Sequence, residues 1–175
     1  MKKRNPFITQ AALIAALYVV LTLVSAAFGL DSKAIQFRLS EVLTVLPALT
    51  PAAIPGLFIG CLLSNFICGA MLPDMIFGSL ATLIGAVGTY FIGKRVKWLS
   101  ALPPEWGGGG GCPPPPPPIA ANTVIVPLVL KYAYHLDGTV PFFALTVFIG
   151  EFVCCGILGT VLLYAIPKRL AAQMK

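Results

Sequence analysis

Five polar side chains stand out in a strongly apolar chain: Arg38, Glu41, Asp74, Asn122 and Glu151. Hydrophobic residues make up 58% of the sequence and charged residues only 10%, and the mean hydropathy is +0.91. A charged side chain at bilayer depth costs about 2.5–3.5 kcal/mol on insertion scales. The charges that remain in such a chain therefore indicate an internal site for a ligand, an ion or a proton.

Glu151 is the strongest candidate, because it lies deep in an apolar run with no charged residue within one or two helical turns. A buried carboxylate of this kind needs a cation, an array of donors or a proton. Asn122 can donate and accept in the same cavity. A carboxylate and an amide together suit the polar edge of a heteroaromatic ring, and aromatic side chains would supply its stacking face. The candidates for that face are Phe37, Phe66, Phe148 and Phe152.

The other polar positions have structural alternatives. Arg38 and Glu41 are three residues apart, so on a helix they share a face and would form an ion pair at the outer membrane edge. Asp74 follows Pro73 at the start of a helix, where a carboxylate also complements the helix dipole. Asn65 would hydrogen-bond a neighbouring helix. Each of these residues is a binding candidate with a purely structural alternative.

The elements that position these residues are predicted to be membrane helices. A chain of 175 residues has room for about six short spans of roughly 20 residues each. A break at Thr50-Pro51 follows from the restriction that a proline places on the preceding residue. The fold class is thus an all-α integral membrane protein with six transmembrane helices in one domain, residues 1–175. The expected spans are Phe7–Phe28, Leu39–Leu49, Ala52–Ala70, Met75–Gly93, Ile119–Tyr134 and Val140–Ile166.

The charges predict the orientation. Nine of the twelve cations fall in three clusters, at residues 2–4, 94–97 and 168–175, which flank apolar spans. The positive-inside rule then places both termini and the 98–118 loop in the cytoplasm. A cleavable signal peptide is the competing interpretation of the first run, but that run is longer than a signal core of roughly 7–15 residues.

The loop at 98–118 contains a low-complexity insertion, five glycines followed by Cys112 and six prolines. Neither part satisfies its backbone groups internally, so the segment cannot cross a membrane. The five cysteines form no Cys-x-x-Cys pair and His135 is the only histidine, so we expect no metal site. Despite the net charge of +6, we expect no nucleic-acid binding, since no basic patch is interleaved with aromatics.

Small residues recur at helix-packing spacing. Gly56 and Gly60 form a G-x-x-x-G, which in a membrane helix favours close packing within the monomer. A further stripe on the first span either packs internally or meets a partner protein, and the spacing leaves both open. That stripe is Ala11, Ala12, Ala15 and Ala16.

The sequence also carries a recognisable pattern. Residues 35–47 read IQFRLSEVLTVLP, residues 53–61 read AIPGLFIGC and residues 74–83 read DMIFGSLATL; PPIAAN at 117–122 and Gly150-Glu151 complete the pattern. These blocks resemble the queuosine-precursor transporter family, which is similar to the substrate-binding S components of energy-coupling factor (ECF) transporters. The glycine- and proline-rich insertion departs from the family pattern.

The resemblance implies a bacterial plasma-membrane subunit that captures a 7-deazaguanine such as preQ1, preQ0 or queuine. It implies a membrane coupling subunit, which the alanine stripe would face, and two cytoplasmic ATPases, because the chain has no phosphate loop of its own. An S component for thiamine or a flavin, and a ligand-free assembly subunit, are the alternatives. We expect no enzymatic activity and no cofactor. The implied substrate contacts are Gln36, Phe37, Arg38, Glu41, Asn65, Asp74, Asn122 and Glu151.

Overall fold

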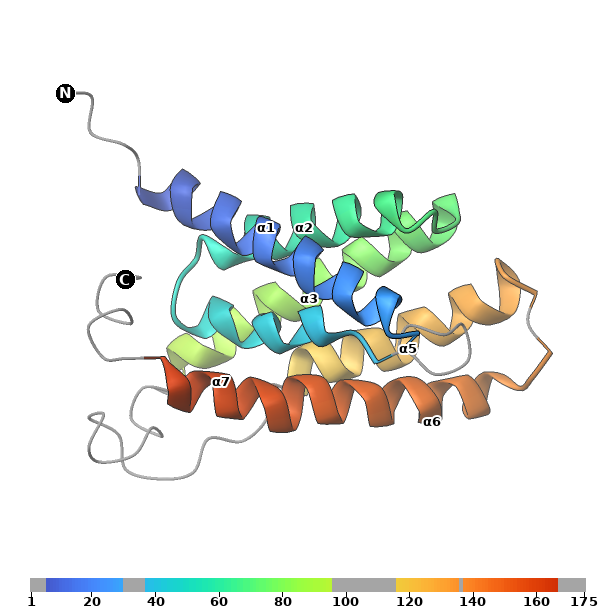
Figure 1. Ribbon diagram of the computed structural model, residues 1–175. Helices are drawn as coiled ribbons and strands as arrows, with labels where there is room; N and C mark the ends of the chain where they lie inside the picture. The colour runs from blue at the N-terminus through green and yellow to red at the C-terminus, as the bar shows by residue number, and fades with distance from the viewer. Residues whose placement is uncertain (1–5, 30–36, 96–115, 136, 167–175) are drawn as a thin grey trace.

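The computed structural model describes residues 6–29, 37–95, 116–135 and 137–166. Regular secondary structure in these ranges is entirely helical, and the helices form an elongated bundle (Figure 1). The elements are α1 (Pro6–Ala27), η1 (Leu39–Ala48), α2 (Ala53–Ile67), α3 (Leu72–Arg95), α5 (Pro116–Tyr132), α6 (Val140–Glu151), η3 (Phe152–Leu158) and α7 (Gly159–Ala165).

Three of the helical stretches are long and apolar enough to cross a membrane: Pro6–Ala27, Leu72–Lys94 and Val140–Ala165. The last of these is one continuous rod made of α6, η3 and α7 (Figure 1). Two of the remaining elements, η1 and α2, are shorter apolar helices. Large hydrophobic side chains are exposed on α1, α3 and α5, including Ile8, Leu72 and Val124, which are 64%, 72% and 65% exposed. A bundle with an apolar exterior is built for lipid, so the all-helical membrane class is confirmed.

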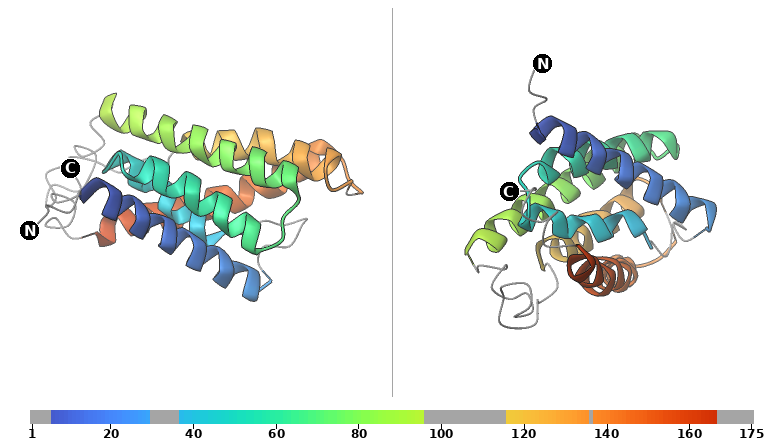
Figure 2. Two further views of the ribbon diagram at one scale, coloured as in Figure 1. Left: turned by 90° about the horizontal axis from the view of Figure 1, so that it is seen from above. Right: turned by 60° about the vertical axis from the view of Figure 1, so that its left-hand side comes forward.

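Successive helices reverse direction through the bundle. The start of α1, the end of α3, the start of α5 and the end of α7 lie at one end, and the α2–α3 and α5–α6 connections lie at the other (Figures 1 and 2). Neighbours in sequence pack side by side, α1 on α2, α2 on α3, α3 on α5 and α5 on α6. This order brings the long helices around one central element.

That central element is η1. It contacts α1, α2, α3, η3 and α7, and most of its side chains are buried, Glu41 among them. It is a 3₁₀ helix of ten residues, whereas runs beyond three or four residues are uncommon. With Pro47 inside it, this segment cannot make the full α-helical hydrogen-bond ladder. A residue on η1 is therefore held in the interior of the bundle.

Glycine allows two close helix approaches. A Cβ at Gly60 would lie 2.8 Å from Tyr18 Cβ, and one at Gly56 would lie 2.8 Å from the Ala11 carbonyl oxygen. The G-x-x-x-G therefore packs α2 onto α1 within the monomer, as its spacing predicts. On the other side of the bundle, Gly85 of α3 receives Pro118 of α5, whose Cα would lie 2.7 Å from an added Cβ.

The helix boundaries agree with the expected spans to within a few residues, with two differences. The second span is a 3₁₀ helix, for which the hydrophobic pattern gives no signal. The fifth helix begins at Pro116 rather than Ile119, because proline is tolerated in the first helical turn. The last three prolines of the insertion thus belong to α5, while residues 98–115 lie outside the described part.

Candidate functional site

Two irregular helices carry the two buried glutamates. Glu41 lies in the first turn of the 3₁₀ helix η1, and Glu151 is the last residue of α6, directly before the π-helical segment η3. The elements η1 and η3 pack against each other. Segments of π-helix are rare and are frequent at functional sites, and a 3₁₀ run as long as η1 is uncommon. The backbone irregularity therefore coincides with the most costly side chains in the chain.

Glu41, Glu151 and Cys155 meet at this contact. Their nearest ligand atoms all lie within 4.8 Å of one another. The two glutamates are only 2% and 7% exposed, and the Cys155 side chain is fully buried. Two carboxyl groups this close in an apolar interior need donors, a cation or a proton between them.

Donors from three helices reach these carboxyl groups. Tyr18 of α1 donates its hydroxyl to Glu41 Oε1. Asn122 of α5 donates from Nδ2 to Glu151 Oε1 at 2.7 Å, and Cys155 Sγ lies 3.0 Å from Glu151 Oε2. We call these five residues, Tyr18, Glu41, Asn122, Glu151 and Cys155, the inner cluster. The Glu41–Glu151–Cys155 spacing also suits a metal ion, although hydrogen-bond donors already approach the carboxylate oxygens that would bind it.

A polar cavity of about 330 Å³ opens between the ends of α1, α2 and α5 and the start of α3. Arg38 reaches into it and donates from Nη1 to Asn65 Oδ1 at 3.3 Å. Tyr134 donates to Asp74 Oδ2 at 2.9 Å and accepts from the Met71 backbone N–H at 3.2 Å. We call it the outer cavity; its lining is Ala26, Arg38, Asn65, Cys68, Gly69, Ala70, Met71, Asp74, Leu130 and Tyr134.

The expected site residues thus fall into two adjoining groups. Three of them, Arg38, Asn65 and Asp74, line the outer cavity, and three others, Glu41, Asn122 and Glu151, form the inner cluster. The start of η1 joins the groups, since the Glu41 backbone N–H donates to the Arg38 carbonyl oxygen at 3.0 Å. Arg38 itself precedes the helix in an extended conformation, so the expected shared helical face is replaced by a bend.

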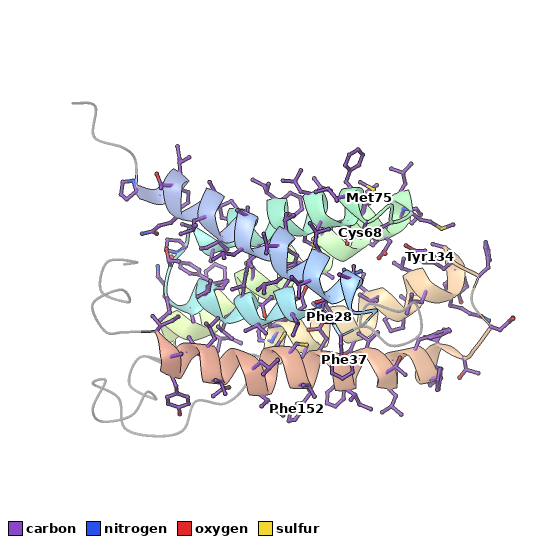
Figure 3. The ribbon with its side chains drawn as sticks, in the orientation of Figure 1. Phe28, Phe37, Cys68, Met75, Tyr134 and Phe152 are labelled. Carbon is purple, nitrogen blue, oxygen red and sulfur yellow. The ribbon has the colours of Figure 1, made fainter. Side chains whose placement is uncertain are left out.

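Of the four aromatic candidates for the stacking face, one is half-buried and three are exposed. Phe37 is half-buried beside Arg38, toward the middle of the bundle (Figure 3). Phe66 is 70% exposed, and Phe148 and Phe152 are each 43% exposed and stack on one another with centroids 6.1 Å apart. Figure 3 shows Phe152 on the outer edge of the bundle. The structure therefore turns these three rings away from the polar groups. Gln36 lies outside the described residues.

Three members of the two groups are additions to the expected set. Tyr18 and Cys155 sit in apolar runs, where an aromatic or a cysteine usually indicates core packing. Tyr134 lies at the end of a span, where tyrosine is common as a membrane-interface residue. The sequence gives one signal for Tyr18, a hydroxyl within an otherwise apolar run. A buried tyrosine hydroxyl usually has a hydrogen-bond partner, so this position indicates a polar group nearby.

Two further hollows are apolar. The larger, about 680 Å³, lies between α3 and α5 and is lined by residues such as Phe77, Leu80 and Leu128. Its lining is almost entirely apolar and includes one polar side chain, Tyr132. The other, about 410 Å³, runs along the seam of α1 and α2, where Ile59 and Leu63 meet the stripe of Ala11, Ala12, Ala15 and Ala16. The stripe thus borders the α1–α2 contact and leaves Ala12 and Ala16 exposed.

These features define a multi-pass membrane protein with a polar site enclosed by apolar helices. Comparison with known proteins gives its family. The family model described as QueT transporter matches residues 8–168, and the chain belongs to this family. It is also similar to the queuosine precursor transporter QueT of Lactococcus lactis subsp. cremoris (strain MG1363), with 38% identity over 85 residues. That match covers 48% of this chain, and the chain spans about half (50%) of the relative's length. No solved structure matches the chain.

Proposed function

We propose that this chain is the substrate-capture subunit of a transporter for a queuosine precursor in the bacterial plasma membrane. The family membership and the printed name of the Lactococcus relative support the substrate class. The observation that carries the proposal is the outer cavity, a polar space of about 330 Å³ next to buried carboxyl groups inside an apolar bundle. Small-molecule sites are typically of at least this size, with a few placed polar groups.

The polar groups match a 7-deazaguanine in kind. Such a ring presents N–H donors along one edge and a carbonyl acceptor beside them. Glu151 would accept from the donor edge, and Asn122, which now donates to Glu151 at 2.7 Å, would turn to the ring. Arg38 would donate to the carbonyl. A buried carboxylate that loses one donor must gain another, so the ligand would substitute for the internal partner.

The remaining contacts surround this ring position. Glu41, held by Tyr18, would close the inner side, and Asn65 and Asp74 would bound the outer cavity. Phe37 would offer the stacking face and Gln36 would add a polar contact from the segment before η1. An amide, an arginine and carboxylates in one enclosed space give both donors and acceptors, which a neutral apolar ligand would leave unsatisfied.

We further infer six membrane passes with both termini in the cytoplasm, in a single domain. The shorter elements fall below the roughly 30 Å of the hydrocarbon core. The 17 residues of α5 rise about 26 Å and the ten residues of the 3₁₀ helix η1 roughly 20 Å, so each of these passes would include residues that flank the helix. The cation clusters at 2–4, 94–97 and 168–175 support the orientation.

The energy for uptake would come from partners. A membrane coupling subunit and two cytoplasmic ATPases of an ECF module would join the chain, with the exposed alanines Ala12 and Ala16 at the coupling interface. Small residues allow the close helix approach that associates membrane helices. The groove along α1 and α2 supports this surface as the docking face.

The test is the melting temperature of the detergent-purified chain with a panel of 7-deazaguanines, thiamine, riboflavin and biotin. Ligand at a hundredfold excess over its dissociation constant stabilises the folded state by about 2.7 kcal/mol. Selective stabilisation by a 7-deazaguanine is the expected result. Stabilisation by thiamine or riboflavin alone would contradict the substrate and keep the architecture, and no shift with any compound would favour an assembly subunit.

A further inference from the structure

The thiol of Cys155 lies among polar atoms at the contact between η3 and η1. Its Sγ is 3.0 Å from Glu151 Oε2 and 3.4 Å from the Glu41 carbonyl oxygen. The Thr44 hydroxyl lies 3.2 Å from the same sulfur and 2.6 Å from the same carbonyl oxygen. A buried cysteine that only fills space needs no polar neighbours, so these contacts indicate a further role for the thiol.

The neighbouring Cys154 shows packing without such contacts. It lies in the same π-helical segment and is 1% exposed, against 0% for Cys155. Within the described part of the chain, its sulfur makes no hydrogen bond. Successive residues of a helix do not face the same neighbour, so two cysteines with the same backbone and the same burial have different surroundings. Burial alone therefore does not account for the contacts of Cys155.

The thiol has one hydrogen to donate, and its acceptor follows from the distances. Glu151 Oε2, at 3.0 Å, is the nearer oxygen, and a carboxylate is a stronger acceptor than a carbonyl group. The Glu41 carbonyl oxygen already has a closer donor, the Thr44 hydroxyl at 2.6 Å. The thiol hydrogen therefore goes to Glu151, while Thr44 and the Glu41 carbonyl of η1 hold the sulfur in place.

Glu151 thus has a donor on each oxygen, Asn122 on Oε1 at 2.7 Å and Cys155 on Oε2. In the proposed binding mode Asn122 turns to the ligand, and Cys155 stays on the carboxylate. An ionised carboxylate accepts about four hydrogen bonds, so Oε2 can accept from a ligand and from the thiol together. A side chain that is fixed before the ligand arrives loses less conformational freedom on binding.

We propose that Cys155 is a positioning residue for Glu151, whose thiol fixes the plane of the carboxylate that accepts from the captured compound. The inference rests on the proposed function, in which Glu151 contacts the ligand, and it is independent of which 7-deazaguanine is captured. Cys155 acts through Glu151 and does not touch the ligand itself. Loss of the thiol therefore weakens binding more than the loss of an equally buried sulfur beside it.

The test compares dissociation constants of the purified full chain by isothermal titration. The probe is the 7-deazaguanine that raises the melting temperature of the wild-type chain most. Cys155→Ala is expected to weaken binding about three- to tenfold, the range of one hydrogen bond. Cys155→Ser should stay within about twofold of wild type, because a hydroxyl also donates. Cys154→Ala, the matched control, removes the neighbouring buried sulfur and should keep the wild-type affinity.

The S–H stretching band in the infrared spectrum tests the hydrogen bond itself, without ligand. The band that disappears in Cys155→Ser belongs to Cys155, and the band that disappears in Cys154→Ala belongs to Cys154. The Cys155 band is expected at the lower frequency, since donation weakens the S–H bond. In Glu151→Gln it should move to higher frequency, because an amide oxygen is a weaker acceptor than a carboxylate.

Equal affinities of Cys155→Ala and Cys154→Ala, a missing rescue by serine, or coincident bands of the two thiols would overturn the positioning role and leave the proposed function standing. If Cys155→Ala does not fold, Cys155→Val, which fills the space without a donor, takes its place in the comparison. Failure of the wild-type chain to bind any 7-deazaguanine, with the Cys155 band still at the lower frequency, would overturn the proposed function and keep the hydrogen bond.

Discussion

Tyr18 donates its hydroxyl to Glu41 and so ties α1 to the central helix η1 across 23 residues of chain. The tyrosine is fully buried and the glutamate is 2% exposed. A second hydrogen bond joins the same two helices, from the Leu39 backbone N–H to Ser25 Oγ at 2.9 Å. Two hydrogen bonds therefore hold α1, the helix with the alanine stripe, against η1, the helix that carries Glu41.

Removing the tyrosine hydroxyl tests the contribution of the Tyr18–Glu41 hydrogen bond. Tyr18→Phe leaves Glu41 Oε1 without this donor in an apolar interior, which should lower the free energy of unfolding by about 1–3 kcal/mol. The measurement is the melting temperature without ligand. Tyr164→Phe is the matched control, since Tyr164 lies 36% exposed on α7. Equal melting temperatures for the two variants would show that the Tyr18–Glu41 bond contributes nothing.

Helix packing predicts opposite outcomes for two glycines, Gly60 in the α1–α2 contact and Gly78 on α3. At Gly60 an added Cβ would meet Tyr18 Cβ at 2.8 Å and the Ala15 carbonyl oxygen at 3.1 Å, so Gly60→Ala should cost about 1–3 kcal/mol through overpacking. At Gly78 the nearest atoms lie at 3.4 Å and 3.5 Å, which is ordinary contact. Gly78→Ala should therefore be neutral or gain up to about 1 kcal/mol of helix propensity. Ligand-free melting curves measure both, and a tolerated Gly60→Ala would contradict the close approach.

The long helices were predictable because their signal is simple. An apolar run bounded by charges or prolines predicts a span from lipid chemistry alone, and α1, at Pro6–Ala27, lies within one residue of the expected Phe7–Phe28. The helix type was not predictable. A 3₁₀ segment and a π segment have the same apolar composition as an α-helix, so Leu39–Ala48 and Phe152–Leu158 required the tertiary packing to identify them.

Glu151 gives a prediction about binding. Glu151→Gln keeps the shape of the side chain but replaces a carboxylate, which only accepts hydrogen bonds, by an amide. The NH2 group of that amide would face a donor of the ring. We expect the affinity for a 7-deazaguanine to fall about tenfold or more, measured by isothermal titration. Thr160→Val is the control: this half-buried residue donates, within the described part of the chain, to the Gly156 carbonyl oxygen one turn earlier in the same helical stretch. Unchanged affinity in Glu151→Gln would remove this residue from the binding site.

The coupling surface gives a prediction about assembly. Ala12→Leu with Ala16→Leu fills the groove beside Ile59 and Leu63 and should prevent close approach of a partner helix. We expect co-purification with the coupling subunit and uptake into cells to be lost, while ligand affinity stays at the wild-type value. Ala165→Leu, on an exposed position of α7, should retain both. Normal assembly of the double variant would place the partner elsewhere.

The site itself was predictable in part, residue by residue. The charges and amides were identifiable because each is costly in a membrane, and six of them lie in the two polar groups that the structure brings together. Their partners were not, because Tyr18, Cys155 and Tyr134 are residues that apolar helices tolerate without a function. Tyr18 and Glu41 are 23 residues apart in the chain, and Thr44 and Cys155 are 111 residues apart. The packing of η1 brings each of these pairs together, and the sequence does not show it.

Equilibrium binding of a radiolabelled aminomethyl 7-deazaguanine to the purified chain in detergent tests the central claim most directly. Saturable binding of one ligand per chain, displaced by unlabelled compound and unaffected by excess adenine, is the predicted result. A folded, monodisperse preparation that gives no saturable binding over the accessible concentration range would contradict the capture of a queuosine precursor by this chain.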